Sequence, residues 1–286
     1  MHTPVMAVEA IEALAVRPDG VYGDVTTGLG GHTRLIAERL TTGLVVACDR
    51  DPESLEQARR NAADCADRIR FVETRFSGLS AALHGLGIGK LDGLLADLGT
   101  SRYQLTDSER GFSFSADGPL DMRMSRAQTL TAADVVNFTA EKALADLLYR
   151  CGQERRGRQI ARAIVRARPI RSTRHLAQVV ESAARRTGRL HPATKTFMAL
   201  RLTVNEEQEE LDALLEQAPG LVRAGGRLVV ISFMSLEDGK VKRAFQGLAR
   251  GGRVKILTKH VVKPSAGEVE SNPASRSARL RVAELL

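Results

Sequence analysis

The chain has no tryptophan and is poor in other aromatic residues and in cysteine. Phe and Tyr make up 4% of its 286 residues, so a hydrophobic core has to be built mainly from Leu, Val, Ile and Ala. The three cysteines, Cys48, Cys65 and Cys151, form no CxxC pair and have no histidine at the spacing of a metal site. We therefore expect no disulfide scaffold and no metal, and a reducing compartment fits this pattern.

Long hydrophobic runs are also missing. No stretch reaches the roughly eighteen apolar residues that a membrane-spanning helix needs. The first residues, MHTPVMAVEAIEAL, carry acids and lack the basic stretch of a signal peptide. The sequence thus predicts neither an anchor nor a leader, and we expect a cytoplasmic protein with no membrane contact.

Positive charge is concentrated in one part of the chain. Residues 123–205 contain seventeen Lys or Arg against five Asp or Glu, an excess larger than the net +8 of the whole chain. Fifteen of the seventeen are Arg, which pairs with phosphate through two parallel hydrogen bonds. A basic segment in a mildly acidic remainder predicts binding to a polyanion, although Arg is also common on solvated helical faces.

Strand-like and helix-like segments alternate in the first hundred residues, and this pattern is typical of βαβ units and a parallel sheet. An irregular Gly- and Ser-rich stretch follows, then a series of amphipathic helices, and strands return near the end. The expected strands are 21–26, 44–49, 69–74, 91–98, 227–233, 253–262 and 277–286; the expected helices include 32–40, 52–66, 139–152, 155–168 and 205–226.

The economical interpretation is an α/β fold with one mostly parallel, Rossmann-like sheet of seven strands. The sheet is interrupted after its fourth strand by a basic helical insert, and its last two strands pair as a hairpin. We predict a discontinuous domain of residues 1–105 and 206–286, and an inserted loop and helical domain of residues 106–205 that recognises RNA.

The first candidate site is the turn DVTTGLGGHT, which follows the first strand. Gly28, Gly30 and Gly31 permit positive φ and a close approach of the backbone to a ligand, and a helix begins near His32. A glycine turn after a strand is often only a turn, so this signal is weak on its own.

Further candidates lie at or just beyond successive strand ends. Asp49 ends the second strand, where a carboxylate accepts hydrogen bonds from both hydroxyls of an adenosine ribose, while Asp51 fits better as the cap of the next helix. Phe76 follows the third strand and suits the face of an adenine. Asp97 ends the fourth strand, at the edge where open α/β sheets bind ligands.

Both NAD and S-adenosylmethionine are bound by sites of this kind. A dinucleotide site normally carries GxGxxG. In GLGGHT, His32 and Thr33 stand at the end of the motif, where its third glycine would be expected. S-adenosylmethionine has no pyrophosphate and needs no such cradle. An NAD-dependent oxidoreductase is therefore the weaker alternative.

Several stretches along the chain match the pattern of one known family. They include GLGGHT (28–33), DRDP (49–52), DGLLADLG (92–99), ERGFSFSADGPLDMRM (109–124), HPATKTFMALRLTVNEE (191–207) and NPASRSARLRVAE (272–284). Through them the chain resembles the MraW/RsmH family of bacterial methyltransferases, which methylate the N4 amino group of a cytidine in small-subunit (16S) ribosomal RNA. The resemblance implies a class I methyltransferase fold, S-adenosylmethionine as cofactor, and ribosomal RNA within an assembled small subunit as partner, with no obligate protein partner. The cofactor contacts that it implies are Gly30, Gly31, His32, Asp49, Phe76, Asp97 and Gln104.

The sequence departs from the family pattern at several places. Met234 stands where the family has a histidine in SFHSLEDR, and Gly239 where it has an arginine. Gln153 and Ala274 replace a usual Glu and a usual Arg. These departures keep open the alternative of an RNA- or ribosome-binding paralogue with altered target or reduced turnover.

The catalytic residues are less clear than the cofactor site. A cytosine amino nitrogen is a poor nucleophile, because its lone pair is delocalised into the ring. An enzyme must align it and accept hydrogen bonds from its protons. We take Asp117 and Asp121 in the Gly- and Pro-rich loop, and Ser232 after the fifth strand, as candidates.

Overall fold

The computed structural model describes residues 4–184 and 190–286, which divide into two compact units. The first, called the sheet unit, is the described chain up to Gly99 together with Gln208–Leu286. The second, called the helical unit, is Thr100–Glu207. Its boundaries lie a few residues from the expected ones, because the short helix α5 (Arg102–Thr106) groups with the helical unit.

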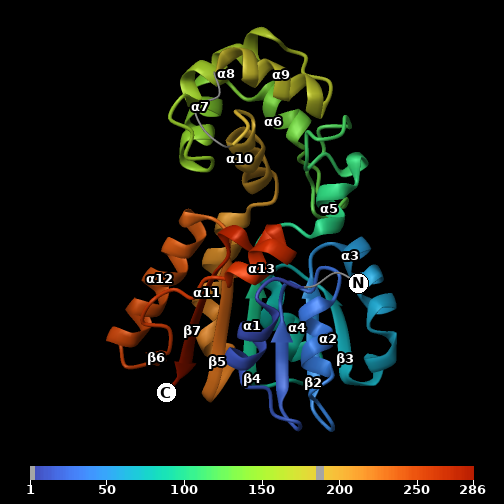
Figure 1. The fold of residues 1–286 in the computed structure, drawn as a ribbon, viewed down its shortest axis with the longest axis vertical. Coiled ribbons are helices and arrows are strands. Elements are labelled where there is room, and N and C mark those ends of the chain that lie inside the picture. Colours follow the sequence, from blue (N-terminus) through green and yellow to red (C-terminus); the bar gives the residue numbers. More distant parts are fainter. Residues whose placement is uncertain (1–3, 185–189) are drawn as a thin grey trace. The chain divides into compact units, whose positions relative to one another are not determined.

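In the described part of the chain, one sheet of seven strands runs through the sheet unit in the order β3-β2-β1-β4-β5-β7-β6 (Figure 1). Strand β7 is antiparallel to both of its neighbours, and the other pairs are parallel. This is the class I methyltransferase arrangement that the sequence predicts, with the insert after the fourth strand. The strands are β1 (Val21–Asp24), β2 (Leu44–Asp49), β3 (Ile69–Glu73), β4 (Leu91–Asp97), β5 (Val222–Ser232), β6 (Val254–Ile256) and β7 (Arg279–Leu285).

Helices cover both faces of this sheet, and consecutive strand residues enter different cores. On β5, for example, Val229 packs with helices α1 and α2, while Val230 packs on the other side with α4, α11 and α12. Strands buried on both faces read as continuous apolar runs, which explains why they were visible in the sequence. The helices of this unit are α1 (Ala7–Leu14), α2 (Gly31–Ala37), α3 (Pro52–Asn61), α4 (Leu79–Gly85), α11 (Glu207–Leu221), α12 (Ser235–Arg250) and α13 (Ala266–Ser271), with short 3-10 helices at Ala63–Arg68, Phe76–Gly78 and Pro273–Ser277.

The end of the chain differs from the expectation. Residues 253–262 were predicted as one strand, but β6 stops at Ile256. Beyond it, the N–H groups of Leu257 and Thr258 donate to the carbonyl oxygen of Val282 in β7, and Val262 forms an isolated bridge with Leu280. The pairing of β6 with β7 is antiparallel as predicted, and the connection between them contains α13.

The helical unit has its own hydrophobic core, to which Leu148, Ile160 and Leu176 contribute fully buried side chains. None of the described helices in either unit is long and apolar enough to cross a membrane. After α5 and a 3-10 turn at Ser108–Arg110, the helices of this unit are α6 (Ala132–Phe138), α7 (Glu141–Arg150), α8 (Gly157–Arg166), α9 (Thr173–Ala183) and α10 (Thr194–Val204).

The irregular stretch before α6 is a packed body. The guanidinium of Arg110 is buried and donates hydrogen bonds to the carbonyl oxygens of Arg123 (3.1 Å) and Met124 (2.8 Å). Gly111 has a φ of 70°, and a Cβ placed there would lie 2.1 Å from the carbonyl oxygen of Pro119. The motif that carries the family resemblance therefore holds this segment together.

Candidate cofactor site

Three aspartates end neighbouring parallel strands of the sheet unit. Asp24 is the last residue of β1, Asp49 of β2 and Asp97 of β4. Strands β2, β1 and β4 are adjacent and parallel, so the three carboxyl groups lie at one edge of the sheet. That edge is where open α/β sheets bind their ligands.

Asp24 is fully buried and braces the turn that follows β1. Its carboxylate accepts hydrogen bonds from the Thr33 hydroxyl (2.6 Å) and the Thr26 backbone N–H (3.2 Å). Burial raises the pKa of Asp24 to about 6, although these bonds act in the opposite direction. Asp24 thus ties the start of the turn to helix α2 from within the protein.

Asp49 joins the glycine turn to the start of helix α3. Its two carboxylate oxygens accept from the backbone N–H groups of Gly28 (2.8 Å) and Asp51 (2.9 Å). Burial raises the pKa of Asp49 to about 6 against the effect of these bonds. Each oxygen keeps a further lone pair, so the carboxylate remains able to accept the ribose hydroxyls expected from the sequence. Asp51 caps α3 as predicted, by accepting from the Glu53 N–H (3.1 Å).

The glycines of the turn are required by packing as well as by conformation. Gly30 has a φ of 84°, and a Cβ on it would lie 3.1 Å from the Cβ of Ala58. A Cβ on Gly31 would lie 3.0 Å from the Cβ of Pro4. The turn therefore fits closely between α3 and the N-terminal segment, an explanation that does not require a ligand.

His32 and Asp97 lie beside each other at the same edge. The Nδ1 atom of His32 is 3.7 Å from Oδ2 of Asp97, and its Nε2 atom is 3.0 Å from the carbonyl oxygen of Val5. Asp97 also has a buried oxygen, Oδ1, that finds no hydrogen-bond partner among the described residues. A buried acceptor without a donor is the observation that most directly indicates room for a polar ligand.

The surroundings of Asp97 are acidic. Its pKa is raised well above the usual value, first by burial and then by the charges of Asp24, Glu237 and Glu268. A cationic ligand would be favoured at such a place, because it offsets the repulsion among the carboxylates. Asp24 ends a strand next to that of Asp97, whereas Glu237 and Glu268 lie on helices and outside the strand ends from which the sequence predicts the site.

The two added acids are held by the backbone. Glu237, near the start of α12, accepts from the N–H groups of Phe233 and Met234, each at 3.1 Å. Glu268 of α13 accepts from the N–H of Met6 at 2.6 Å. Glu268 follows Ser265 in a Ser-x-x-Glu capping pattern, and its N–H donates to the Ser265 hydroxyl at 3.1 Å. Glu237 has the same place in α12, but Met234 stands at the cap position, so the local pattern is incomplete there.

The remaining expected cofactor residues have structural partners. Phe76 begins a 3-10 turn after β3, is half-buried, and packs in part on the core beneath α4 and α11. Gln104 belongs to the helical unit and is buried, where it forms a reciprocal cap with Ser101 at the start of α5. Contact of either residue with the cofactor stays a prediction.

The catalytic candidates fall into both units. Ser232 is the buried last residue of β5, next to Ile231, which pairs with Asp97. It thus lies at the same edge of the sheet as the aspartates, and its hydroxyl is 3.5 Å from the carbonyl oxygen of Arg279. The other two candidates, Asp117 and Asp121, belong to the helical unit.

Both loop aspartates have partners within the helical unit. Hydrogen bonds from the Ser172 hydroxyl and the Arg174 N–H lower the pKa of the exposed Asp117. Burial acts to raise the pKa of Asp121, but a fork of bonds from Arg123, at 2.7 and 2.9 Å, lowers it on balance. The lone pairs of Asp121 are therefore partly used, and catalysis by either aspartate stays a prediction.

Comparison with known proteins decides the family. Residues 1–286 match the model of the MraW methylase family. The chain belongs to this family. It is 63% identical over its full length, and that of its relative, to ribosomal RNA small subunit methyltransferase H of Solibacter usitatus. It is 49% identical to the protein of that name from Koribacter versatilis, over 99% of this chain and 93% of the relative. An rRNA methylase structure from Streptococcus thermophilus aligns with a TM-score of 0.48 and 11% identity, over 100% of this chain and 99% of the other.

Membership in a methylase family agrees with the cofactor expected from the sequence, S-adenosylmethionine. Among the described residues, no group of three or more His, Cys, Asp or Glu side chains is placed to hold a metal ion. The polar groups that the structure gathers at the strand ends are instead carboxylates with raised pKa values, one histidine and the backbone of the glycine turn.

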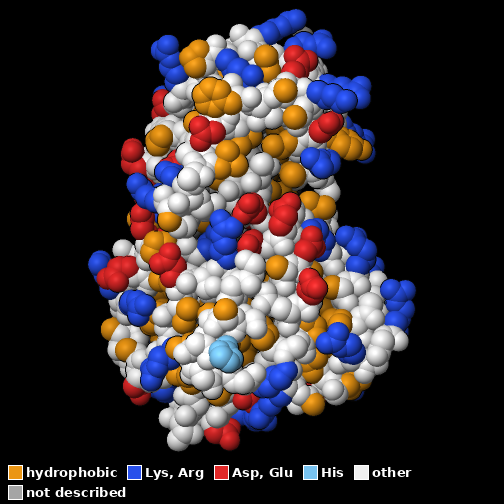
Figure 2. All heavy atoms as spheres, turned by 180° about the vertical axis from the view of Figure 1, so that it is seen from behind, with side chains coloured by type: hydrophobic (Ala, Val, Ile, Leu, Met, Phe, Trp, Pro, Cys, Tyr) orange, Lys and Arg blue, Asp and Glu red, His pale blue; other side chains and the backbone are white. Residues whose placement is uncertain are grey.

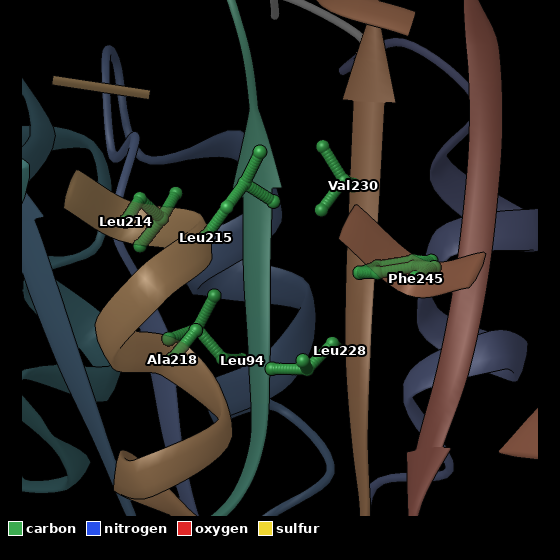
Figure 3. Close-up of a pocket in the computed structure, with 7 residues that line it drawn as sticks. All are labelled: Leu94, Leu214, Leu215, Ala218, Leu228, Val230 and Phe245. Atoms are coloured by element: carbon green, nitrogen blue, oxygen red, sulfur yellow. The ribbon is translucent and has the colours of Figure 1, made fainter. Parts of the chain in front are cut away.

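A small cavity elsewhere in this MraW-family protein is not a second site. It lies between the sheet and the helices α11 and α12 and has a volume of about 10 Å³, room for at most about one water (Figure 3). Its lining is entirely apolar and consists of Leu94, Leu214, Leu215, Ala218, Leu228, Val230 and Phe245. It is a gap between two packed layers and offers no polar group to a ligand.

Proposed function

We propose that this protein transfers a methyl group from S-adenosylmethionine to the N4 amino group of a cytidine in small-subunit ribosomal RNA. The observation that carries the proposal is the edge of aspartates at the ends of β1, β2 and β4, in a chain of the MraW methylase family. The names of the relatives, which specify ribosomal RNA of the small subunit, support the choice of substrate.

The residues at this edge suit the proposed cofactor. Asp49 retains lone pairs for the ribose hydroxyls, and the partnerless oxygen of Asp97 lies in acidic surroundings that favour a cation. S-adenosylmethionine supplies a methyl group already activated on a positively charged sulfur. The raised pKa of Asp97 therefore supports the proposal beyond the shape of the site.

The amino group of the target needs an acceptor for its protons and a fixed direction. Ser232 supports this role best of the three candidates, because it lies at the same strand edge as Asp97. Asp121 is less suited, because Arg123 already binds both of its oxygens. The target base has to leave its stack to be reached, which favours a single-stranded or looped region of the RNA.

One observation favours the alternative of an RNA-binding paralogue with reduced turnover. Met234 stands where the family has a histidine. It is 9% exposed and follows Ser232, the last residue of β5, by two positions. A thioether cannot take or give a proton at that place. The alternative therefore depends on whether the reaction needs such a proton transfer.

Transfer of a tritiated methyl group from S-adenosylmethionine distinguishes the two functions. The acceptors would be assembled small subunits that lack the modification, and the same RNA free of protein. We expect labelled N4-methylcytidine in the digested RNA, and much less label with Asp49→Ala at a cofactor concentration near the Kd of the parent. Label on another base or another atom would contradict the cytidine assignment, and RNA binding without any label would favour the paralogue.

A further inference from the structure

The basic side chains of the helical unit differ in how strongly they are bound within it. Some are bound within the unit: Arg168, for instance, donates to the carbonyl oxygens of Val136 and Thr139 at the end of α6. Arg123, Arg156 and Arg201 likewise form ion pairs with neighbouring acids. Others are exposed, and Figure 2 shows Lys and Arg side chains of this unit next to exposed hydrophobic ones.

Three of the exposed arginines form a row on helix α8. Arg158, Arg162 and Arg166 follow one another at intervals of four residues, so they lie along one side of the helix and rise by about 6 Å from one to the next. We call them the arginine row. Its spacing resembles that of the phosphates in an extended nucleic acid strand.

An exposed tyrosine borders one end of the row. Tyr149, in the last turn of α7, keeps 63% of its surface exposed. A Cβ on Gly157, the first residue of α8, would lie 3.5 Å from the Tyr149 nitrogen, and Arg162 further along pairs with Glu141 at 3.4 Å. Helices α7 and α8 are therefore antiparallel, and the backbone of Tyr149 lies at the end of α8 where the arginine row begins.

An exposed phenylalanine borders the other end. Phe138, the last residue of α6, is 81% exposed. Its neighbour Asn137 exchanges two hydrogen bonds with Ile170, at 2.7 and 3.1 Å, and Arg168 binds the carbonyl oxygen of Thr139. Arg168 and Ile170, just beyond the arginine row, therefore hold the backbone on both sides of Phe138, whose own side chain is largely exposed.

We propose that the arginine row and the two bordering rings bind a single-stranded stretch of RNA outside the reacting base. The arginines would pair with phosphates, and the rings of Phe138 and Tyr149 would stack on bases, the combination that non-specific single-strand sites use. The proposal rests on the proposed function, because that function makes RNA the substrate. The charge and the rings together argue for this occupant, because a single strand offers phosphates to the three arginines and a base face to each exposed ring.

The absence of tryptophan makes stacking directly measurable. The chain has three tyrosines, and Tyr22 is buried, so emission changes on adding RNA report mainly on Tyr149 and Tyr103. We expect a short single-stranded RNA to quench tyrosine emission of the full chain. Tyr149→Leu should remove most of that quenching, and Tyr149→Phe should keep the affinity while losing the signal.

Affinity measured by fluorescence anisotropy of labelled RNA at several salt concentrations separates the two kinds of contact. Phe138→Leu or Tyr149→Leu should weaken binding about tenfold with an unchanged salt slope, because no charge is lost. Replacing the arginine row with Gln should lower the slope by about 0.7 per lost contact. The matched control replaces the exposed Arg243, Arg250 and Arg253 of the sheet unit with Gln and should leave binding unchanged.

The outcomes distinguish this surface from the function it serves. If the parent methylates its RNA but the ring and arginine variants bind RNA as tightly as the parent, the surface is wrong and the function stands. Binding of an acidic protein but not of RNA through this face would also overturn it. If the parent neither binds nor methylates RNA, both proposals fail.

Discussion

The His32 ring lies between two acceptors, with Nε2 3.0 Å from the Val5 carbonyl oxygen and Nδ1 3.7 Å from Oδ2 of Asp97. A carbonyl oxygen only accepts, so Nε2 carries a hydrogen and Nδ1 faces the carboxyl group. The 3.7 Å between Nδ1 and Oδ2 exceeds hydrogen-bond distance, so the ring faces the carboxyl group without sharing a hydrogen with it. Protonation of Asp97, whose pKa is raised by burial, changes the charge at the edge where the cationic cofactor is proposed to bind.

Stability of the cofactor-free protein should fall as the pH rises from 5 to 8. The pKa values of Asp24 and Asp49 rise from 3.8 to about 6 on folding, and that of Asp97 rises further. The folded state therefore holds protons that the unfolded state has released, which makes folding less favourable as these groups ionise. For Asp24 and Asp49 the loss spans about pH 4 to 6, and for Asp97 it extends higher.

Thermal unfolding of the parent and Asp97→Asn across this range tests the sign. The amide cannot ionise, so the variant should melt higher than the parent at pH 8 and gain less at pH 5. Asp238 provides the contrast, because Arg281 lowers its pKa against the effect of burial. Asp238→Asn should lower the melting temperature at neutral pH. An advantage of Asp97→Asn that shrinks with rising pH would contradict the assignment.

Replacement of Asp49 by Ala should weaken S-adenosylmethionine and S-adenosylhomocysteine to a similar extent, since both carry the same ribose. Loss of a charged acceptor for two hydroxyls is worth about 2–4 kcal/mol, or roughly 30- to 1000-fold in affinity. Calorimetric titration measures both ligands. Asp51→Ala is the matched control: it removes the cap of α3 and should lower stability by about 1 kcal/mol with little effect on affinity. Equal affinities in Asp49→Ala and the parent would remove Asp49 from the site.

Met234→His should change the methylation rate by less than about tenfold, which is 1.4 kcal/mol of barrier. The methyl group arrives already activated, and the amino proton becomes acidic only after the transfer, so a strong base is not needed. Met234 would then act as a packing residue. Single-turnover methyl transfer measures the rate. A thousandfold increase would show that the family histidine is catalytic and that this chain is an impaired or repurposed paralogue.

Gly111→Ala should destabilise the helical unit strongly. The added Cβ would lie 2.1 Å from the Pro119 carbonyl oxygen, and the φ of 70° is unfavourable for alanine. Gly87→Ala is a matched control, because Gly87 has a φ of 72° but nothing within 4 Å of its Cβ. It should cost about 1 kcal/mol, the price of the conformation alone. Similar melting temperatures for the two variants would mean that the loop around Gly111 relaxes freely.

The sheet and its acidic edge were predictable because their signals are local. Runs such as LVVACD combine β-branched residues with a terminal aspartate, and a Pro after Asp51 marks the start of α3. The carboxyl ends of parallel strands lie at one edge of a sheet in any strand order, so parallel strands place Asp49 and Asp97 at the same edge without any knowledge of side-chain contacts.

The parts that the sequence did not predict depend on contacts between distant segments. Glu268 acts on Asp97 from a helix whose own sequence carries no site pattern. The loop containing Arg110 lacks periodicity because its order comes from buried hydrogen bonds to other loop carbonyls. The expected strand 253–262 was apolar enough for pairing, but its ladder with β7 ends at Ile256. Beyond it, Leu257 and Thr258 both turn onto Val282, and Val262 forms an isolated bridge.

The bond between the Met6 backbone and Glu268 joins residues 262 positions apart. A chain emerging from the ribosome folds from its N-terminal end, so Met6 is made long before its partner exists. One edge of strand β5 also stays without its neighbour until β7, the last strand in the sequence, has been synthesised. The acids around Asp97 are therefore complete only when translation is nearly finished, because Glu268 is among the last residues to be made.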